Sequence, residues 1–218
     1  MINNPHNPTG YLMSKDKFEA LVKIAKENNL FLFSDEVYRG LEYKQEDRLP
    51  AVCEVYDKGI SLGVMSKTFG LAGLRIGWIV AKDGDLLKKI ASFKDFTTID
   101  NSAPSEFLAT LALRHKEEII KRNLEIIKGN LKLVDDFLIK HGDLFEWTRP
   151  RAGPIGLVKM NFDKNSEDFC IDVVEKKSLM LLPSTVYDIG DKHFRVGMGR
   201  KNTPEALKKF EEYIQDNL

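Results

Sequence analysis

The sequence predicts an α/β protein: a mainly parallel sheet in its first part, followed by a smaller α+β subdomain at its C-terminal end. Two observations support this prediction. Amphipathic helix and short apolar strands alternate along the first 81 residues, as β–α–β connections require. After Gly142 the pattern changes to short apolar runs separated by helices, which is typical of a separate α+β subdomain.

The first predicted helix begins after Ser14, which is a favourable N-cap residue, and ends near Asn28. A strand over residues 30–33 follows it directly. Residues 41–58 are polar and irregular, with Pro50 as a breaker. The apolar positions of the helix recur at intervals of three and four residues, which places them on one face. These positions are Phe18, Leu21, Val22 and Ala25.

Two further strands are predicted at residues 60–65 and 77–81, before a helical region from 84 to 141 that is broken near 100–104. The second half of this region has heptad-like spacing. A long helix packed within its own protein is the favoured interpretation, and a dimeric coiled coil is the alternative. The stripe consists of Ile120, Leu124, Ile127, Leu131, Val134 and Leu138.

The C-terminal part contains apolar runs at 155–160, 179–182 and 194–196, and a helix near 166–176. A closing helix is predicted to start at Thr203-Pro204-Glu205, with Thr203 as its N-cap and proline in its first turn. Its inward stripe is predicted to be Leu207, Phe210 and Ile214.

Composition narrows the classes of function. The 218 residues include 33 basic and 33 acidic side chains, so neither nucleic acid nor an anionic membrane surface is indicated as a partner. No apolar run approaches the roughly 20 residues that span a bilayer, and no signal peptide precedes the first motif. Cys53 and Cys170 are expected to be reduced core thiols, which fits a cytoplasmic protein. The four histidines lack metal-ligand spacing, so no metal site is predicted.

Lys67 is the most informative residue. It follows an apolar strand in the sequence Ser66-Lys67-Thr68-Phe69-Gly70, and Arg75 comes eight residues later. A lysine amine condenses with carbonyl compounds, and hydroxyl and guanidinium groups bind phosphate. This loop therefore suits a Schiff base between Lys67 and a phosphorylated aldehyde.

Asp35 also follows an apolar strand, and Tyr38 comes three residues later. Ligands of open α/β sheets lie beyond the carboxyl ends of the strands, so Asp35 and Lys67 are expected on the same rim. A carboxylate there can pair with a protonated pyridine nitrogen, while Tyr38 and Asn7 can hydrogen-bond a phenolic oxygen. Taken alone, Asp35 could equally cap a helix, and Tyr38 could simply pack against the strand end.

Four motifs in this order resemble the class I and II aminotransferases, the fold-type I enzymes that use pyridoxal 5′-phosphate (PLP). The resemblance covers nearly the whole chain from residue 3 onward. The motifs are Asn7-Pro8-Thr9-Gly10, Asp35-x-x-Tyr38, Ser66-Lys67 with Arg75, and Phe194-Arg195-Val196-Gly197.

The resemblance implies roles for seven residues. Lys67 would be the catalytic, cofactor-bound lysine, and Asp35 would keep the pyridine nitrogen protonated. Ser66 and Arg75 would bind the cofactor phosphate. Asn7 and Tyr38 would hydrogen-bond the ring oxygen of the cofactor. Arg195 would bind the substrate α-carboxylate through two hydrogen bonds. For Arg195 an internal salt bridge is the alternative, and Arg200 is a less favoured substitute.

The implied organisation is a partial PLP-binding large domain over 1–115, a linking helix over 116–141 and a small α+β domain over 142–218. Members of the family have a long N-terminal portion before the asparagine motif, whereas only nine residues precede Gly10 here. We therefore expect a family member without that portion. The sequence leaves open whether this chain alone is active.

The implied reaction is amino-group transfer between an amino acid and a 2-oxo acid, in a homodimer if the full fold is present. Two alternatives stay open. One is a PLP-dependent C–S β-lyase of the same fold, and the other is a non-catalytic remnant that keeps the motifs.

Overall fold

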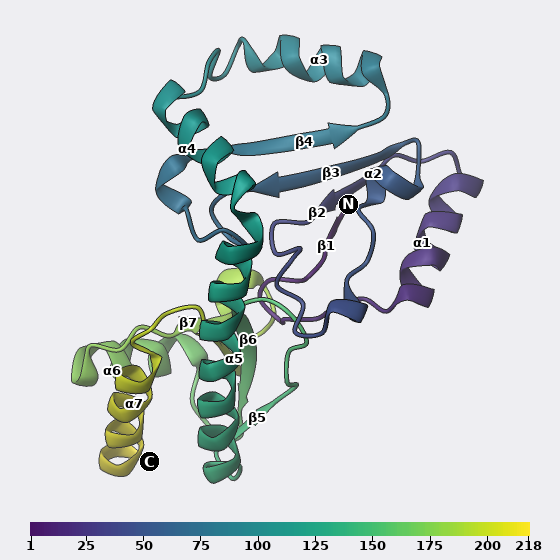
Figure 1. Ribbon diagram of the computed structural model, residues 1–218. Helices are drawn as coiled ribbons and strands as arrows, with labels where there is room; N and C mark the ends of the chain where they lie inside the picture. Colours follow the sequence, from purple (N-terminus) through teal and green to yellow (C-terminus); the bar gives the residue numbers. More distant parts are fainter. The chain divides into compact units, whose positions relative to one another are not determined.

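The computed structural model describes all residues from 1 to 218. The chain divides into two compact units (Figure 1). The first unit comprises Met1–Pro5 and Leu12–Asn123, and the second comprises His6–Tyr11 and Leu124–Leu218. The domain boundaries predicted from the sequence, at residues 115 and 141, stay predictions.

The first unit is built on a four-stranded sheet in the order β1-β2-β3-β4. Pairing is parallel between β1 and β2 and between β2 and β3, and antiparallel between β3 and β4. The prediction of a mainly parallel sheet is therefore confirmed. The strands are β1 (Ile2–Asn3), β2 (Leu32–Asp35), β3 (Gly59–Val64) and β4 (Gly77–Ala81).

Helix α1 (Lys15–Glu27) agrees with the predicted helix and buries three of its four predicted apolar positions, Phe18, Val22 and Ala25. They join Leu32 of β2 and Tyr56 in one apolar core. This core fixes the position of β2, the strand that carries Asp35.

Strand β2 begins two residues later than predicted, because Leu30 takes part in the turn that terminates α1. Asn29 has a left-handed backbone with φ of 56°, and the Leu30 amide donates to the Ala25 carbonyl at 2.9 Å. These contacts form a common helix-terminating motif, which delays the start of the strand. The segment predicted to be irregular also contains a short helix, α2 (Val52–Val55).

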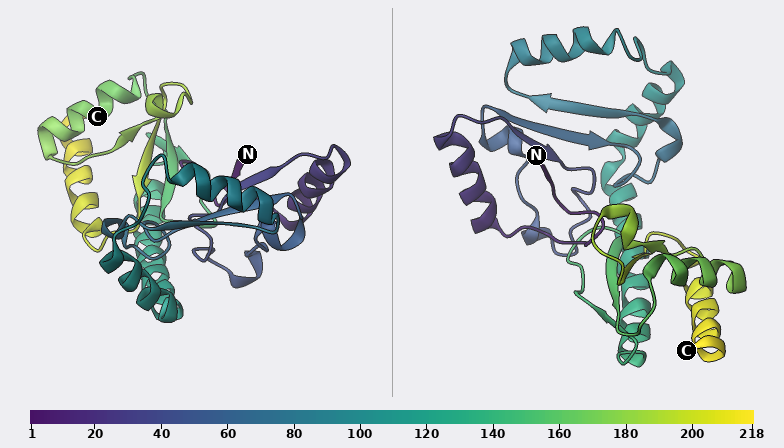
Figure 2. Two further views of the ribbon diagram at one scale, coloured as in Figure 1. Left: turned by 90° about the horizontal axis from the view of Figure 1, so that it is seen from above. Right: turned by 180° about the vertical axis from the view of Figure 1, so that it is seen from behind.

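Helices α3 (Gly84–Lys94), α4 (Ala103–Arg114) and α5 (Lys116–Lys140) confirm the helical region and its break near residue 100. A second break, at His115, separates α4 from α5. Helix α3 runs alongside β4, the outer strand of the sheet (Figure 2). Several large apolar side chains are exposed along α3 and α4 and between them: Phe93, Phe96, Ile99, Phe107, Leu108 and Leu111.

The second unit has an antiparallel sheet in the order β5-β6-β8-β7, together with α6 (Ser166–Lys177), α7 (Thr203–Asn217) and most of α5. The predicted α+β part is confirmed. Helix α7 begins at Thr203, as predicted, but its N-cap is Asn202. The strands are β5 (Phe145–Trp147), β6 (Ile155–Met160), β7 (Leu182–Pro183) and β8 (His193–Gly197).

Aromatic side chains form the core of the second unit. The Phe194 ring of β8 lies 5.4 Å from the Phe169 ring and 5.6 Å from the Phe145 ring, centroid to centroid. Phe210 of α7 packs on Phe194 at 5.9 Å. This core holds β8 in place, and β8 carries Arg195 on its other face.

Three short 3₁₀ turns complete the secondary structure, at Gln45–Asp47, Ala72–Leu74 and Ser184–Tyr187. Cys53 and Cys170 are both buried and unbonded, as expected for core thiols, and burial raises the pKa of the Cys170 thiol to about 12. None of the helices combines the length and apolar character that a membrane crossing requires.

Candidate functional site

The site predicted in the first unit lies at the carboxyl edge of its parallel strands. Asn3 pairs with Asp35 and Asp35 pairs with Leu62, so the ends of β1, β2 and β3 are aligned. Because these three strands run in the same direction, the residues that follow them leave the sheet at one edge. Asp35 and the loop that carries Lys67 therefore share this edge.

Lys67 is exposed, and its amine makes no hydrogen bond or ion pair. The loop behind it is well anchored. The Leu71 amide donates to the Met65 carbonyl at 2.9 Å, the Gly70 amide donates to the Lys67 carbonyl at 3.0 Å, and Met65 is fully buried. The structure therefore presents a free amine on an ordered loop.

Thr68 is a residue that the sequence reasoning missed. It is buried, and its hydroxyl lies 2.9 Å from the carbonyl oxygens of Val37 and Arg39. These contacts join the loop after β3 to the loop after β2. A small hydroxylated residue directly after the lysine was visible in the sequence, but its partners lie about 30 positions away and were not.

Asp35 is half-buried, and its carboxylate is partly used by its own loop. The Oδ1 atom accepts a hydrogen bond from the Val37 amide at 3.2 Å. The second carboxylate oxygen, Oδ2, accepts no hydrogen bond and is available to a ligand. Tyr38 is 5% exposed, and its carbonyl accepts from the Leu41 amide at 3.0 Å, which fixes the turn that follows β2.

Ser66 and Arg75 are brought together by the return of the chain into β4. The Arg75 guanidinium donates through Nη1 to the Ser66 hydroxyl at 3.4 Å and to the Ala72 carbonyl at 3.0 Å. Arg75 has φ of 54°, which turns the backbone sharply before β4. A hydroxyl and an exposed cation side by side can bind a phosphate group.

Asn7 and Arg195 meet in the second unit. The Arg195 guanidinium donates through Nη1 to Oδ1 of Asn7 at 2.9 Å, and its Cζ atom lies 5.7 Å from the centre of the Tyr187 ring. The contacts of Arg195 in this structure are with a neutral amide and an aromatic ring, and its role in carboxylate binding stays a prediction. A neutral amide and an aromatic ring orient the guanidinium of Arg195, and its positive charge stays available to an anion.

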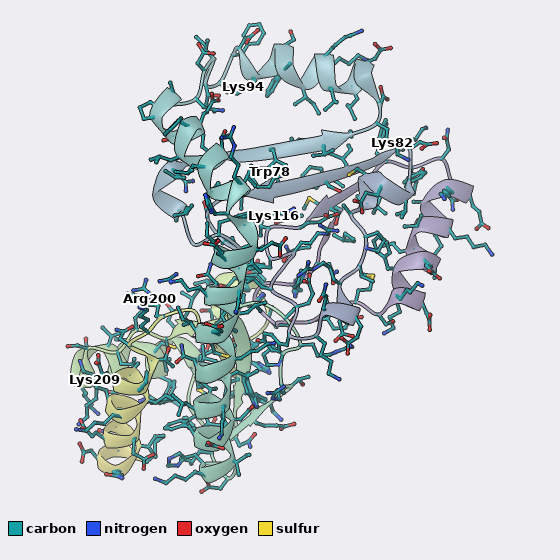
Figure 3. The ribbon with its side chains drawn as sticks, viewed as in Figure 1. Trp78, Lys82, Lys94, Lys116, Arg200 and Lys209 are labelled. Atoms are coloured by element: carbon teal, nitrogen blue, oxygen red, sulfur yellow. The ribbon has the colours of Figure 1, made fainter.

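The turn that carries Asn7 depends on Gly10. The Gly10 amide donates to the His6 carbonyl at 2.9 Å, with φ of 67° at Gly10. A Cβ atom there would lie 2.4 Å from Cβ of Pro150, so only glycine fits. His6 bonds Thr9 within the same turn, and burial lowers the pKa of its imidazole. The side chain of Arg200 is exposed (Figure 3).

The family model for "Aminotransferase class I and II" matches residues 1–214. The chain therefore belongs to this family of PLP-dependent enzymes. It is 28% identical to an aspartate aminotransferase of Sulfurisphaera tokodaii, over 98% of this chain and 55% of that protein. The chain thus spans about half the length of the curated relatives that it matches.

Solved structures agree on the fold. A PLP-dependent aminotransferase from Streptococcus suis 89-1591 superposes with a TM-score of 0.91 and 33% identity, covering 99% of this chain and 56% of that one. A PLP-dependent cyclase superposes with a TM-score of 0.92 and 27% identity, covering 100% and 59%. The predicted PLP-transferase fold is therefore confirmed.

PLP is the cofactor that this family membership implies, and the residues of the first unit suit it. A carboxylate oxygen without a partner on Asp35 suits a pyridinium nitrogen, and the amine of Lys67 suits an aldehyde. Arg75 beside Ser66 suits a phosphate. The donor set therefore matches the three polar ends of this cofactor.

Proposed function

We propose that this protein transfers amino groups between an amino acid and a 2-oxo acid with PLP, and that Lys67 forms a Schiff base with the cofactor. The observation that carries the proposal is the amine of Lys67, which is exposed and unpartnered on an anchored loop at the same sheet edge as Asp35. Membership of the aminotransferase family supports it.

When bound, PLP supplies an electron sink that stabilises negative charge at the substrate Cα. Asp35 would hold a proton on the ring nitrogen through its free oxygen. Lys67 would place its amine beside the substrate Cα, where it can move the proton of that carbon. The phosphate would be held by Ser66 and Arg75, which fixes the ring relative to this amine.

The other two roles concern binding. We propose that Tyr38 and Asn7 donate hydrogen bonds to the ring oxygen. Arg195 would bind the substrate α-carboxylate through two parallel hydrogen bonds, a geometry that suits a planar guanidinium. Its bond to Asn7 uses only one of its donor groups, Nη1, and leaves others for the carboxylate.

The first test is the covalent adduct. The chain is incubated with PLP, its visible absorbance is recorded, and the mixture is reduced with borohydride and mapped by mass spectrometry. We expect the adduct on Lys67 and its loss in Lys67→Arg, which keeps the charge but cannot condense. Lys89→Arg, on another exposed lysine, is the matched control. An adduct that persists in Lys67→Arg would contradict the proposal.

The type of reaction is tested through its products. Transamination converts a 2-oxo acid into an amino acid, whereas the C–S β-lyase alternative releases pyruvate, ammonia and a thiol. A PLP-dependent cyclase among the similar structures shows that this fold supports other reactions. The absence of any shift in melting temperature with PLP would favour the non-catalytic remnant.

The cytoplasmic location, the homodimer and the three-part domain division stay predictions.

A further inference from the structure

Thr68 links the two loops that carry the proposed catalytic groups. Its backbone amide donates to the Val37 carbonyl at 3.3 Å, and its hydroxyl lies 2.9 Å from the same oxygen. The hydroxyl is also 2.9 Å from the Arg39 carbonyl. One side chain thus contacts the carbonyls on both sides of Tyr38, and it directly follows Lys67.

The hydroxyl contacts are enclosed. Thr68 is 3% exposed, and a Cβ atom at Gly40 would lie 3.2 Å from the Thr68 methyl group, so the methyl sits directly against the backbone of the facing loop. Gly40 has φ of 100°, a conformation that other residues rarely adopt. The facing loop is therefore shaped to receive Thr68, and water cannot readily replace its hydroxyl.

The other side of Thr68 is held by a helix. The side-chain amide of Asn123, on α5, donates to the Thr68 carbonyl at 2.9 Å. Asn123 is the last residue of the first unit. The peptide groups of Thr68 are therefore fixed from both sides, while the preceding residue, Lys67, presents its amine to solvent.

We propose that Thr68 is a positioning residue for Lys67, and that its hydroxyl fixes the lysine loop against the loop of Tyr38 and Asp35. The inference deepens the proposed function, on which its catalytic meaning rests. Without the hydroxyl, the part-buried carbonyls of Val37 and Arg39 lose this contact, and the two loops can separate. The lysine amine then spends less time where the cofactor aldehyde must meet it.

The experiment compares three variants of the full chain. Thr68→Val keeps the shape of the side chain and removes the hydroxyl, whereas Thr68→Ser keeps the hydroxyl. Thr203→Val is the matched control, because the hydroxyl of that buried threonine also donates to a carbonyl, at 2.8 Å from Arg200, but in the second unit. Amide hydrogen exchange is followed by mass spectrometry without cofactor, over residues 36–41 and 65–71.

We expect Thr68→Val to accelerate exchange in both segments by about tenfold, since a buried hydrogen bond is worth about that factor. Thr68→Ser should remain near the parent chain, and Thr203→Val should leave both segments unchanged. With PLP added, the rate of the borohydride-trapped adduct at Lys67 should fall by about tenfold in Thr68→Val only.

The outcomes separate this inference from the proposed function. If the parent chain gives no adduct with PLP, the proposed function fails, and the exchange comparison still decides whether the hydroxyl fixes the two loops. If Thr68→Val accelerates neither segment, or if Thr68→Ser does not restore slow exchange, the inference is overturned. An unchanged adduct rate in Thr68→Val would equally overturn the positioning role.

Discussion

Arg195 shows at the scale of one residue how a neutral partner keeps a charge available. A buried or half-buried arginine is usually neutralised by a carboxylate, but Arg195 instead donates to the Asn7 amide and faces the Tyr187 ring. These contacts orient the guanidinium without cancelling its charge. A carboxylate ligand would therefore bind an oriented guanidinium, and no ion pair would have to break first.

We expect Arg195→Lys to weaken the binding of an α-carboxylate by roughly 10- to 100-fold, because lysine cannot form two parallel hydrogen bonds. Binding is measured from the change in visible absorbance when an amino acid is added to the PLP-loaded chain. Arg200→Lys is the control, since its side chain is exposed nearby in the sequence. A loss seen only in Arg200→Lys would move the carboxylate site to that residue.

Helices and strands with a periodic spacing of apolar residues could be predicted from the sequence. Strands that form only through hydrogen bonds to a neighbouring strand could not. Helix α1 was predicted from the spacing of Phe18, Val22 and Ala25, and the bounds of β4 were predicted correctly. The two-residue β1 and the three-residue β5 have too few positions to show alternation. They are strands only because β2 and β6 supply their hydrogen bonds.

The C-terminal end of α5 is joined to the middle of α7 by a pH-dependent contact. Glu211 of α7 bonds Lys140 at 2.8 Å and His141 at 2.7 Å. The bond from Lys140 and then that from His141 lower the pKa of the Glu211 carboxyl from 4.5 to about 2. The folded protein thus favours the charged carboxylate more than the unfolded chain does.

The sign of the pH effect follows from this shift. The stabilisation by Glu211 is fully present above its unfolded pKa of 4.5 and is lost as the pH falls towards about 2. We expect the urea concentration at the unfolding midpoint of the second unit to decrease when the pH is lowered from 6 to 3. The decrease should be smaller in Glu211→Gln, whose side chain does not titrate. Unfolding is followed by aromatic fluorescence. Equal pH slopes in the two proteins would contradict this role.

For the whole molecule, the sequence predicted which candidate site residues share a sheet edge better than it predicted which side chains contact one another. Ser66, Lys67 and Asp35 could be placed on one rim because parallel strands end at one edge. The contact of Arg195 with Asn7 spans 188 positions, and no local pattern contains it. The link from Thr68 to Val37 was missed for the same reason.

The two units have separate apolar cores, and this has a consequence for unfolding. Phe194 is fully buried among Phe145, Phe169 and Phe210 in the second unit. The core of the first unit consists of other residues, from α1, β2 and α2. Removing the Phe194 ring should therefore destabilise the second unit while leaving the first with its own packing intact.

We expect Phe194→Ala to cost the second unit about 3–5 kcal/mol, as large-to-small changes in buried aromatic cores do. Hydrogen exchange should accelerate across residues 142–218 and in the part of α5 after Asn123, and stay slow in β2, β3 and α1. Val22→Ala is the reciprocal variant, in the first core. Because α5 belongs to both units, comparing the two variants also tests whether the units unfold independently. If either variant accelerates exchange equally in both units, the chain unfolds as one cooperative body.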